Sequence, residues 1–138
     1  MNSAALTAEQ TARVVDIAMD LARTGDTDEL VAFLAHGLPA DVTDPAGNTL
    51  VMLAAYHGHA GTVRALLARG ADPDRTNARG QTPLSGALFK GEDEVVTALL
   101  AAGADLDTGT PTARAAAGLF GRTLPPRPGG ERGPSQAR

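Results

Sequence analysis

The sequence predicts an all-α solenoid, in which one helix–turn–helix unit is repeated and stacked. The sequence pattern from Asp44 to Asp74 is repeated 33 residues later, and a fixed period of this length is typical of stacked repeat arrays. Within each copy, glycines stand where two short helices should end. The composition is 43% hydrophobic but only 3% aromatic, with no Trp, so the core must be built from Ala, Leu and Val. Such small side chains suit thin, closely stacked helices.

Composition and charge narrow the possible functions. The 138 residues are enough for one domain, and they carry a net charge of −4. Residues 1–121 hold 8 basic and 15 acidic side chains, a net charge of −7, whereas residues 122–138 hold four Arg and one Glu, a net charge of +3. An acidic body argues against nucleic acid as the main partner. No apolar run reaches the length of a signal peptide or a membrane span, so we expect a cytoplasmic protein without a membrane partner. Abundant Ala, Gly, Arg and Pro suggest a bacterial genome rich in GC.

The first repeat is predicted over residues 7–42 and is degenerate. Thr7 and Gln10 form a capping-box pattern, so a helix should follow as far as about Arg23. Its apolar residues recur at spacings of three and four, and Gly25 should end it. A second helix, capped by Asp26 or by the residue after it, should continue to about residue 35. A terminal repeat is expected to be atypical, because one of its faces meets water.

The second and third repeats are predicted over residues 43–75 and 76–108. Each opens with an Asx–Gly turn, after which Thr49 or Thr82 should cap a short helix with its hydroxyl oxygen. Pro83 stands at the first helical position, where its missing N–H costs nothing. Glycines 33 residues apart should end both helices of each pair. The second helices should place on their inner faces the apolar residues Val63, Leu66, Leu67, Val96, Leu99 and Leu100.

A fourth, partial repeat is predicted over residues 109–121. Thr112 to Phe120 resembles a first helix that Gly121 ends, after a loop three residues shorter than in the other repeats. We expect residues 122–138, rich in Pro, Gly and Arg, to form a disordered tail outside the domain of residues 1–121. This tail matches the Arg-x-x-Pro-x-x-Pro pattern of polyproline ligands, but in a segment this rich in Pro and Arg a solubilising terminus is the favoured explanation.

The two full copies resemble the ankyrin repeat. The resemblance rests on Gly47-Asn-Thr-Leu-Val-Met-Leu-Ala-Ala-Tyr-His-Gly-His, on Gly80-Gln-Thr-Pro-Leu-Ser, and on the segments Leu-Leu-Ala-Arg-Gly-Ala-Asp and Leu-Leu-Ala-Ala-Gly-Ala-Asp. It is strong over residues 44–107 and weaker over 7–42 and 110–121, and the chain is similar to the small bacterial ankyrin proteins. Met52 and Ser85 stand where the family usually has a His that braces the turn.

The resemblance implies hairpin loops that protrude from a curved stack, with partners bound on the concave face. The positions it assigns to that face are the loop tips and the helix residues before each terminating glycine. We therefore expect partner contacts from Thr43, Pro45, Ala46, Asn48, Tyr56, His57, Thr76, Ala78, Arg79, Gln81, Phe89 and Lys90. The corresponding residues of the first and last repeats, Arg23-Thr24 and Leu119-Phe120, would lie at the two ends of this face.

Two aromatic residues support this location on independent grounds. Tyr56 and Phe89 are one period apart and outside the predicted core set, so stacking should place them side by side. Rigid aromatics in a groove are preferred anchors for binding, although these two could instead pack on each other and on the loop stems. Asp72, Asp74, Asp105 and Asp107 are better explained as turn formers than as a ligand site.

The sequence offers no convincing catalytic or metal chemistry. His57 and His59 flank a helix end and should diverge, and without Cys a zinc site lacks ligands. The glycines are helix ends at the repeat period rather than a phosphate loop, and no serine has an argued His partner. We therefore expect no cofactor, no metal and no enzyme activity.

The resulting hypothesis is a monomeric, non-catalytic module that binds another protein through the concave face. The acidic body would favour a partner with a neutral or basic patch. One alternative is an accessory factor that regulates an enzyme, for which an association of some small bacterial ankyrin proteins with catalases suggests oxidative stress. Another is a reader of peptides or small ligands that uses the tail.

Overall fold

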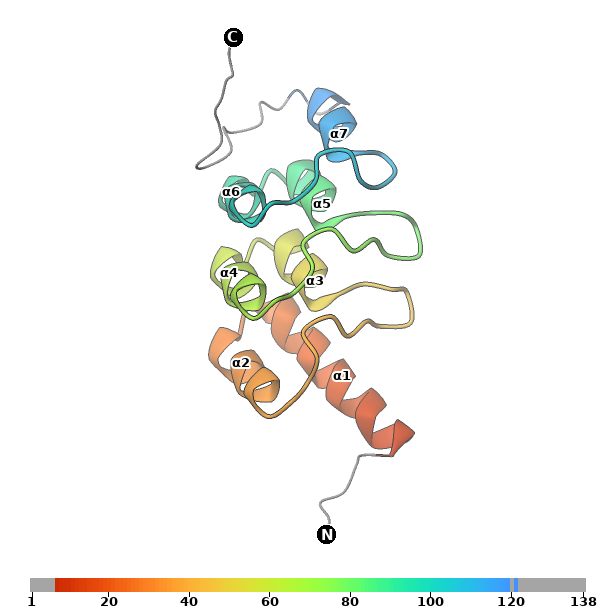
Figure 1. Cartoon of the computed structure of the whole chain (residues 1–138), viewed down its shortest axis with the longest axis vertical. Coiled ribbons are helices and arrows are strands. Elements are labelled where there is room, and N and C mark those ends of the chain that lie inside the picture. The colour runs from red at the N-terminus through yellow and green to blue at the C-terminus, as the bar shows by residue number, and fades with distance from the viewer. Residues whose placement is uncertain (1–6, 120, 122–138) are drawn as a thin grey trace.

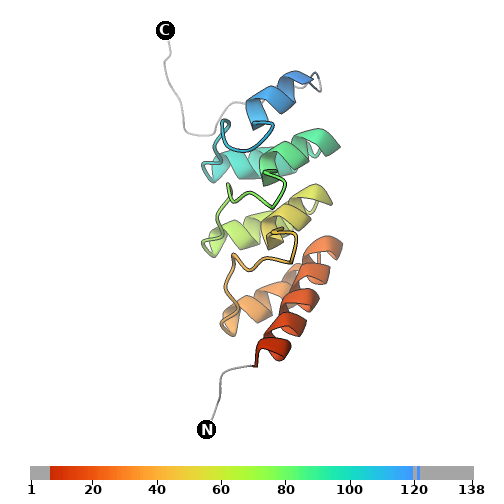
Figure 2. The ribbon, with the colours of Figure 1, turned by 90° about the vertical axis from the view of Figure 1, so that its right-hand side faces the viewer.

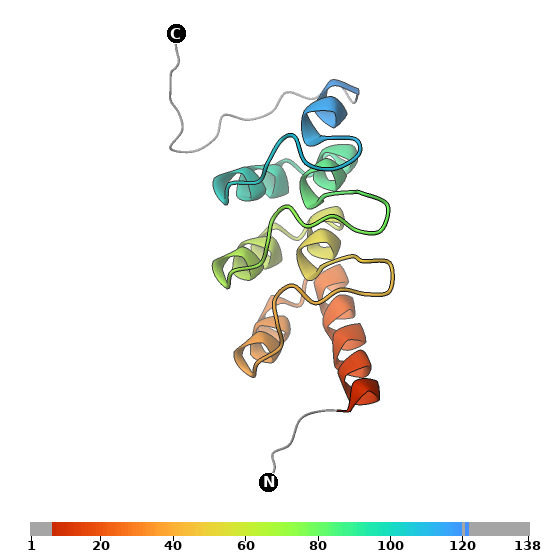
Figure 3. The ribbon, with the colours of Figure 1, turned by 45° about the vertical axis from the view of Figure 1, so that its right-hand side comes forward.

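The computed structural model describes residues 7–119 and residue 121, and this part of the chain is helical apart from its loops. Figure 1 shows two columns of helices. One column contains α1 (Ala8–Thr24), α3 (Leu50–Tyr56), α5 (Pro83–Lys90) and α7 (Ala113–Leu119). The other contains α2 (Thr27–Ala35), α4 (Ala60–Ala68) and α6 (Asp93–Ala101). The long loops between the pairs protrude to one side, and the pairs follow one another along the long axis (Figures 2 and 3). The predicted all-α solenoid is therefore confirmed, while the predicted tail of residues 122–138 lies outside the described residues.

The first helix pair begins and turns as the sequence predicts. The side chains of Thr7 and Gln10 each accept from the other residue's backbone N–H, and Gly25 ends α1 at a left-handed φ of 78°. The predicted cap of α2 is only half right. Asp26 stands at the N-cap but its side chain does not cap the helix, because its carboxylate accepts from Thr24 Oγ1 at 2.7 Å instead.

The first helices of the second and third repeats, α3 and α5, begin at their predicted threonines. Thr49 Oγ1 accepts from the backbone N–H of Met52, and Thr82 Oγ1 accepts from that of Ser85. Ser85 Oγ in turn accepts from the backbone N–H of Thr82 at 3.3 Å. Ser85 therefore completes a capping box at the place where the resemblance led us to expect a bracing His. Met52, at the same place one repeat earlier, is buried and packs by shape alone.

The core runs the length of the stack between the two helix columns. Helix α3 packs against α1, α4 and α5, and α4 packs against α2 and α6. The fully buried large residues include Met19, Leu30, Leu50, Leu66, Leu84, Leu88 and Leu99. Small alanines fill the rest, as the composition predicts.

Burial differs between equivalent and between neighbouring positions. Leu67 is only half-buried at the edge of the core, whereas Leu100, one period later, is buried. On α1, Ile17 is 49% exposed, although the next two residues, Ala18 and Met19, are buried. Equal positions in successive repeats are therefore not always equally buried.

Backbone and carboxylate hydrogen bonds join one repeat to the next. The backbone N–H of Asp72 donates to Asp41 at 2.9 Å, and that of Asp105 donates to Asp74 at 2.7 Å. Asp72 and Asp105 also accept from the backbone two residues later, at 2.8 and 2.9 Å. The prediction that these aspartates form turns is thus confirmed for Asp72 and Asp105. Asp74 instead accepts a bond that links successive repeats, as Asp41 does, and Asp107 pairs with Arg114.

No helix within the described residues is long and apolar enough to cross a membrane.

Candidate functional site

A hollow of the described chain lies where the first-helix column meets the protruding loops. Its volume is about 490 Å³, which is within the range of pockets that hold small ligands or side chains. Helices α3 and α5 form much of its wall, and α1, α7 and the loops before α3, α5 and α7 complete it. We call it the hollow, and its lining residues are Arg23, Asn48, Met52, Leu53, Tyr56, His57, Arg79, Gln81, Thr82, Ser85, Gly86, Phe89, Pro111 and Ala116.

The floor of the hollow is made of small and apolar residues on successive first helices. Leu53 and Gly86 are one period apart, and Ala116 follows 30 residues later, in agreement with the shorter last loop. A Cβ added at Gly86 would lie 3.7 Å from Tyr56 Cδ1, so the missing side chain leaves space beside the aromatic ring. The depth of the hollow therefore depends in part on this glycine.

A column of exposed apolar side chains runs beside the floor. Tyr56, Phe89 and Leu119 occupy matching places on α3, α5 and α7, and they are 39%, 57% and 73% exposed. They are three of the four large hydrophobic residues that the described chain exposes. Tyr56 and Phe89 both line the hollow, as their spacing predicted. Their exposure leaves apolar area available to another molecule.

Cationic groups surround these aromatics. Lys90 Nζ lies 4.8 Å from the centroid of the Tyr56 ring, within the range of a cation–π contact. The His57 ring meets the same tyrosine edge-on, with centroids 5.5 Å apart and planes at 84°. Arg23 and Arg79 line the hollow from the end of α1 and from a loop tip. Burial, together with the positive charges of His59, Lys90 and Arg23, lowers the pKa of His57, so its imidazole is neutral at pH 7.

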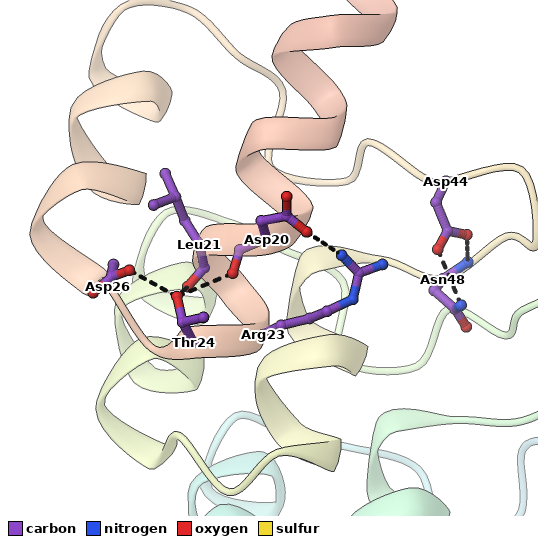
Figure 4. Close-up of polar contacts among 7 residues, drawn as sticks. All are labelled: Asp20, Leu21, Arg23, Thr24, Asp26, Asp44 and Asn48. Atoms are coloured by element: carbon purple, nitrogen blue, oxygen red, sulfur yellow. Dashed lines mark hydrogen bonds and ion pairs between the residues drawn. The ribbon is translucent and has the colours of Figure 1, made fainter.

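Arg23 is held at the end of α1 by one acidic partner. Its Nη1 donates to Asp20 Oδ1 at 2.6 Å, and its side chain remains 41% exposed. Figure 4 shows the guanidinium directed from α1 toward the loop that carries Asp44 and Asn48. Asn48 also lines the hollow, so the arginine and this loop bound it on one side.

The loop tips are fixed by Asx turns and by bonds to each other. Asp44 accepts from the backbone N–H of Ala46 and of Asn48, and Asn77 Oδ1 accepts in the same way from Arg79 and Gln81. Asn77 Nδ2 donates to Asn48 Oδ1 at 2.9 Å across neighbouring loops. The tips therefore present side chains from a rigid base, which limits the entropy lost on binding.

The structure brings only part of the predicted contact set to the hollow. Six of the twelve expected residues line it: Asn48, Tyr56, His57, Arg79, Gln81 and Phe89. Lys90 lies at its rim over Tyr56. The other five are outside the lining, on the loops: Thr43, Pro45, Ala46, Thr76 and Ala78. Thr43 is occupied in an isolated β-bridge with Thr49. The prediction left out the floor residues Leu53, Gly86 and Ala116, although counting back by three from the aromatic column would have found them.

No cluster of three or more His, Cys, Asp or Glu that could hold a metal occurs among the described residues. The two histidines after α3 do diverge, because His59 Nε2 lies 2.8 Å from the carbonyl oxygen of Arg23 while His57 faces Tyr56. His59 is thus part of the structure, and His57 faces the hollow.

Comparisons with known proteins agree with this architecture. Residues 18–110 match the family described as ankyrin repeats in three copies, whose domains are typically non-catalytic. An ankyrin repeat protein of Pseudomonas aeruginosa is 48% identical over 55 residues, which are 40% of this chain and 32% of that protein. The crystal structure of the human ASB11 ankyrin repeat domain is similar with a TM-score of 0.62 and 27% identity, over 64% of this chain and 40% of that one. The chain thus spans less than half the length of both, and the first is a bacterial relative.

Proposed function

Because the chain belongs to the ankyrin repeat family, we propose that it is a non-catalytic module that binds another protein at the hollow and the adjoining loops. Ankyrin repeats are generally modules of protein–protein interaction. The observation that carries the proposal is the exposed apolar column of Tyr56, Phe89 and Leu119 beside a hollow of about 490 Å³. Aromatic side chains that line a concave site are the residues most often found to dominate binding energy.

The fixed loop tips support the same proposal. Asn48, Arg79 and Gln81 stand on turns that are hydrogen-bonded within and between loops, so a partner would meet them in place. A partner that covers the hollow would also reach the outer loop residues Pro45, Ala46, Thr76 and Ala78, which are exposed. We include a monomeric state and a cytoplasmic location in the proposal; light scattering and cell fractionation test them.

The test compares two variants of the full chain in pull-downs from the native cell extract. In Tyr56→Ala/Phe89→Ala the two central aromatics of the column are removed. The control, Ile17→Ala, removes a similarly exposed apolar side chain outside the hollow. Truncation of an aromatic hot spot costs about 2 kcal/mol or more in binding, so the double variant should lose the partner and the control should keep it. Equal capture by both, with both folded, would place the binding surface elsewhere.

A further inference from the structure

We propose that the hollow recognises an acidic segment of the partner, an extended stretch with carboxylates beside a large apolar side chain. This inference rests on the proposed function and adds the chemistry of the occupant. It reverses the expectation from overall charge, which favoured a neutral or basic partner.

Three of the eight basic side chains of the body gather at the hollow. Residues 1–121 hold 8 basic side chains against 15 acidic ones. Arg23 and Arg79 line the hollow, Lys90 stands at its rim, and the imidazole of His57 joins them. A cationic site within an acidic molecule attracts an anion locally while the rest of the surface repels it, and such a field selects for a short acidic stretch.

The nearest carboxylates are already engaged. Asp20 pairs with Arg23 at 2.6 Å, and both oxygens of Asp44 accept hydrogen bonds from Ala46 and Asn48 within their loop. Asp20 offsets the charge of Arg23, and in the described part of the chain neither acid forms an ion pair with Arg79 or Lys90. Arg79 in the wall and Lys90 at the rim supply charged donors, which carboxylates accept strongly.

The apolar column determines the rest of the occupant. Tyr56 and Phe89 are 39% and 57% exposed beside a floor of Leu53 and Gly86, which leaves room for an inserted side chain. Charges next to an apolar wall are less screened by water, so the cations act more strongly here than at an open surface. An occupant with an apolar anchor and flanking carboxylates would use both features at once.

A nucleic acid fits these features less well. Its backbone carries a regular row of charges and would extend past the hollow onto the acidic body. Three Arg and Lys side chains around one hollow match a few carboxylates rather than a long polyanion.

Acidity should strengthen the interaction through His57. The charges that act on its ring are those of Arg23, which pairs with Asp20 on α1, of His59 after α3, and of Lys90 at the end of α5. Glu92 lies against Gly58, the residue after His57. In the free protein the positive neighbours lower the pKa of His57, and a bound carboxylate would raise it again. Binding therefore takes up a proton, so affinity should rise as the pH falls from neutral toward the lowered pKa of His57.

The experiment selects peptides from a random twelve-residue phage library on the full chain, with Tyr56→Ala/Phe89→Ala for counter-selection. The enriched peptides should be net acidic and contain an aromatic or long aliphatic residue. The best peptide is then titrated by fluorescence anisotropy against Arg79→Glu/Lys90→Glu, which should bind it at least about tenfold more weakly, a difference of about 1.4 kcal/mol. The control Arg64→Glu/Arg69→Glu makes the same change in net charge on exposed residues outside the hollow, and it should bind like the wild type.

The outcomes separate this inference from the proposed function. Enriched peptides that are neutral or basic, yet lost with the aromatic variant, would overturn the acidic occupant and leave the binding face intact. Peptides that bind the aromatic variant equally well would overturn both. Failure to enrich any peptide, equal weakening by the two charge variants, or tighter binding of a single-stranded oligonucleotide would also overturn the inference. Tighter peptide binding at pH 5.5 than at pH 7.5 in the wild type, lost in His57→Gln, would support it.

Discussion

Single residues set the junctions between neighbouring repeats. His59 lies over Gly25, the residue that ends α1, and its Nε2 is 2.8 Å from the carbonyl oxygen of Arg23. Because a carbonyl can only accept, Nε2 carries the proton and donates to the negative end of the α1 dipole. A Cβ at Gly25 would lie 2.6 Å from His59 Nδ1, so the glycine is required both by its left-handed φ and by the ring above it.

We therefore expect Gly25→Ala to destabilise the protein by more than Gly70→Ala. Both glycines have a positive φ, 78° and 89°, and alanine there costs about 1–2 kcal/mol. Only at Gly25 does the new methyl group meet another side chain, since nothing lies within 4 Å of a Cβ at Gly70. The free energies of unfolding in urea give the comparison, and adding His59→Ala should recover part of the Gly25→Ala loss. Equal losses for the two glycine variants would show that the backbone conformation alone matters.

At the scale of helices, the sequence predicted starts and ends well and side-chain surroundings less well. Thr7, Thr49 and Thr82 cap as expected, because capping depends on residues only three positions away. The apolar spacing did not distinguish half-buried Leu67 from buried Leu100, because burial depends on the tertiary surroundings of each position. Local patterns therefore predict where a helix lies better than what surrounds it.

In the candidate site, too, the sequence predicted some features and missed others. The period alone placed Tyr56 and Phe89 together at the hollow. The resemblance assigned Arg23, Arg79 and Lys90 to the same face, but it did not predict that they gather around one hollow, because Arg79 comes from a loop tip and Arg23 from the end of another helix. Their proximity results from the path of the loop and from stacking, neither of which has a signature in the spacing of residues.

Within α5, Gly86 links helix stability to the depth of the hollow. We expect Gly86→Ala to raise the free energy of unfolding by about 0.5–1 kcal/mol, because alanine is the better helix former. The new Cβ would stand 3.7 Å from Tyr56 Cδ1, an ordinary contact, so no strain should oppose this gain. The same methyl group would partly fill the hollow and should weaken any ligand bound there.

The matched change Gly61→Ala in α4 has nothing within 4 Å of the new Cβ and lies outside the hollow. It should leave binding unchanged, which separates the filling of the hollow from stabilisation of the fold. Thermal unfolding and peptide titration on both variants provide the measurements. A Gly86→Ala variant that is less stable than the wild type would contradict the open space seen beside Tyr56.

As a whole, the molecule is a stack in which each helix pair is stabilised by its neighbours. Helix α4 contacts α2 on one side and α6 on the other, whereas α2, in the first pair, packs on α1 and α4. In such arrays, stability is close to a sum of terms within repeats and between nearest neighbours. The consequence of a core change should therefore depend on its position along the stack as well as on the atoms removed.

Leu66 and Leu30 allow a direct test, because both are 1% exposed and belong to the second helix of a pair. Replacing either by alanine should destabilise the helix pair that contains it by about 2–5 kcal/mol. Leu66 lies in α4, which has a helix pair on each side. Leu66→Ala should therefore lower the urea concentration at which the whole array unfolds. In Leu30→Ala the first pair should open before the rest, and hydrogen exchange should show lost protection in α1 and α2 with α5 and α6 still protected. If both variants instead lose protection uniformly along the chain, the described repeats behave as one cooperative unit rather than as a stack of coupled pairs.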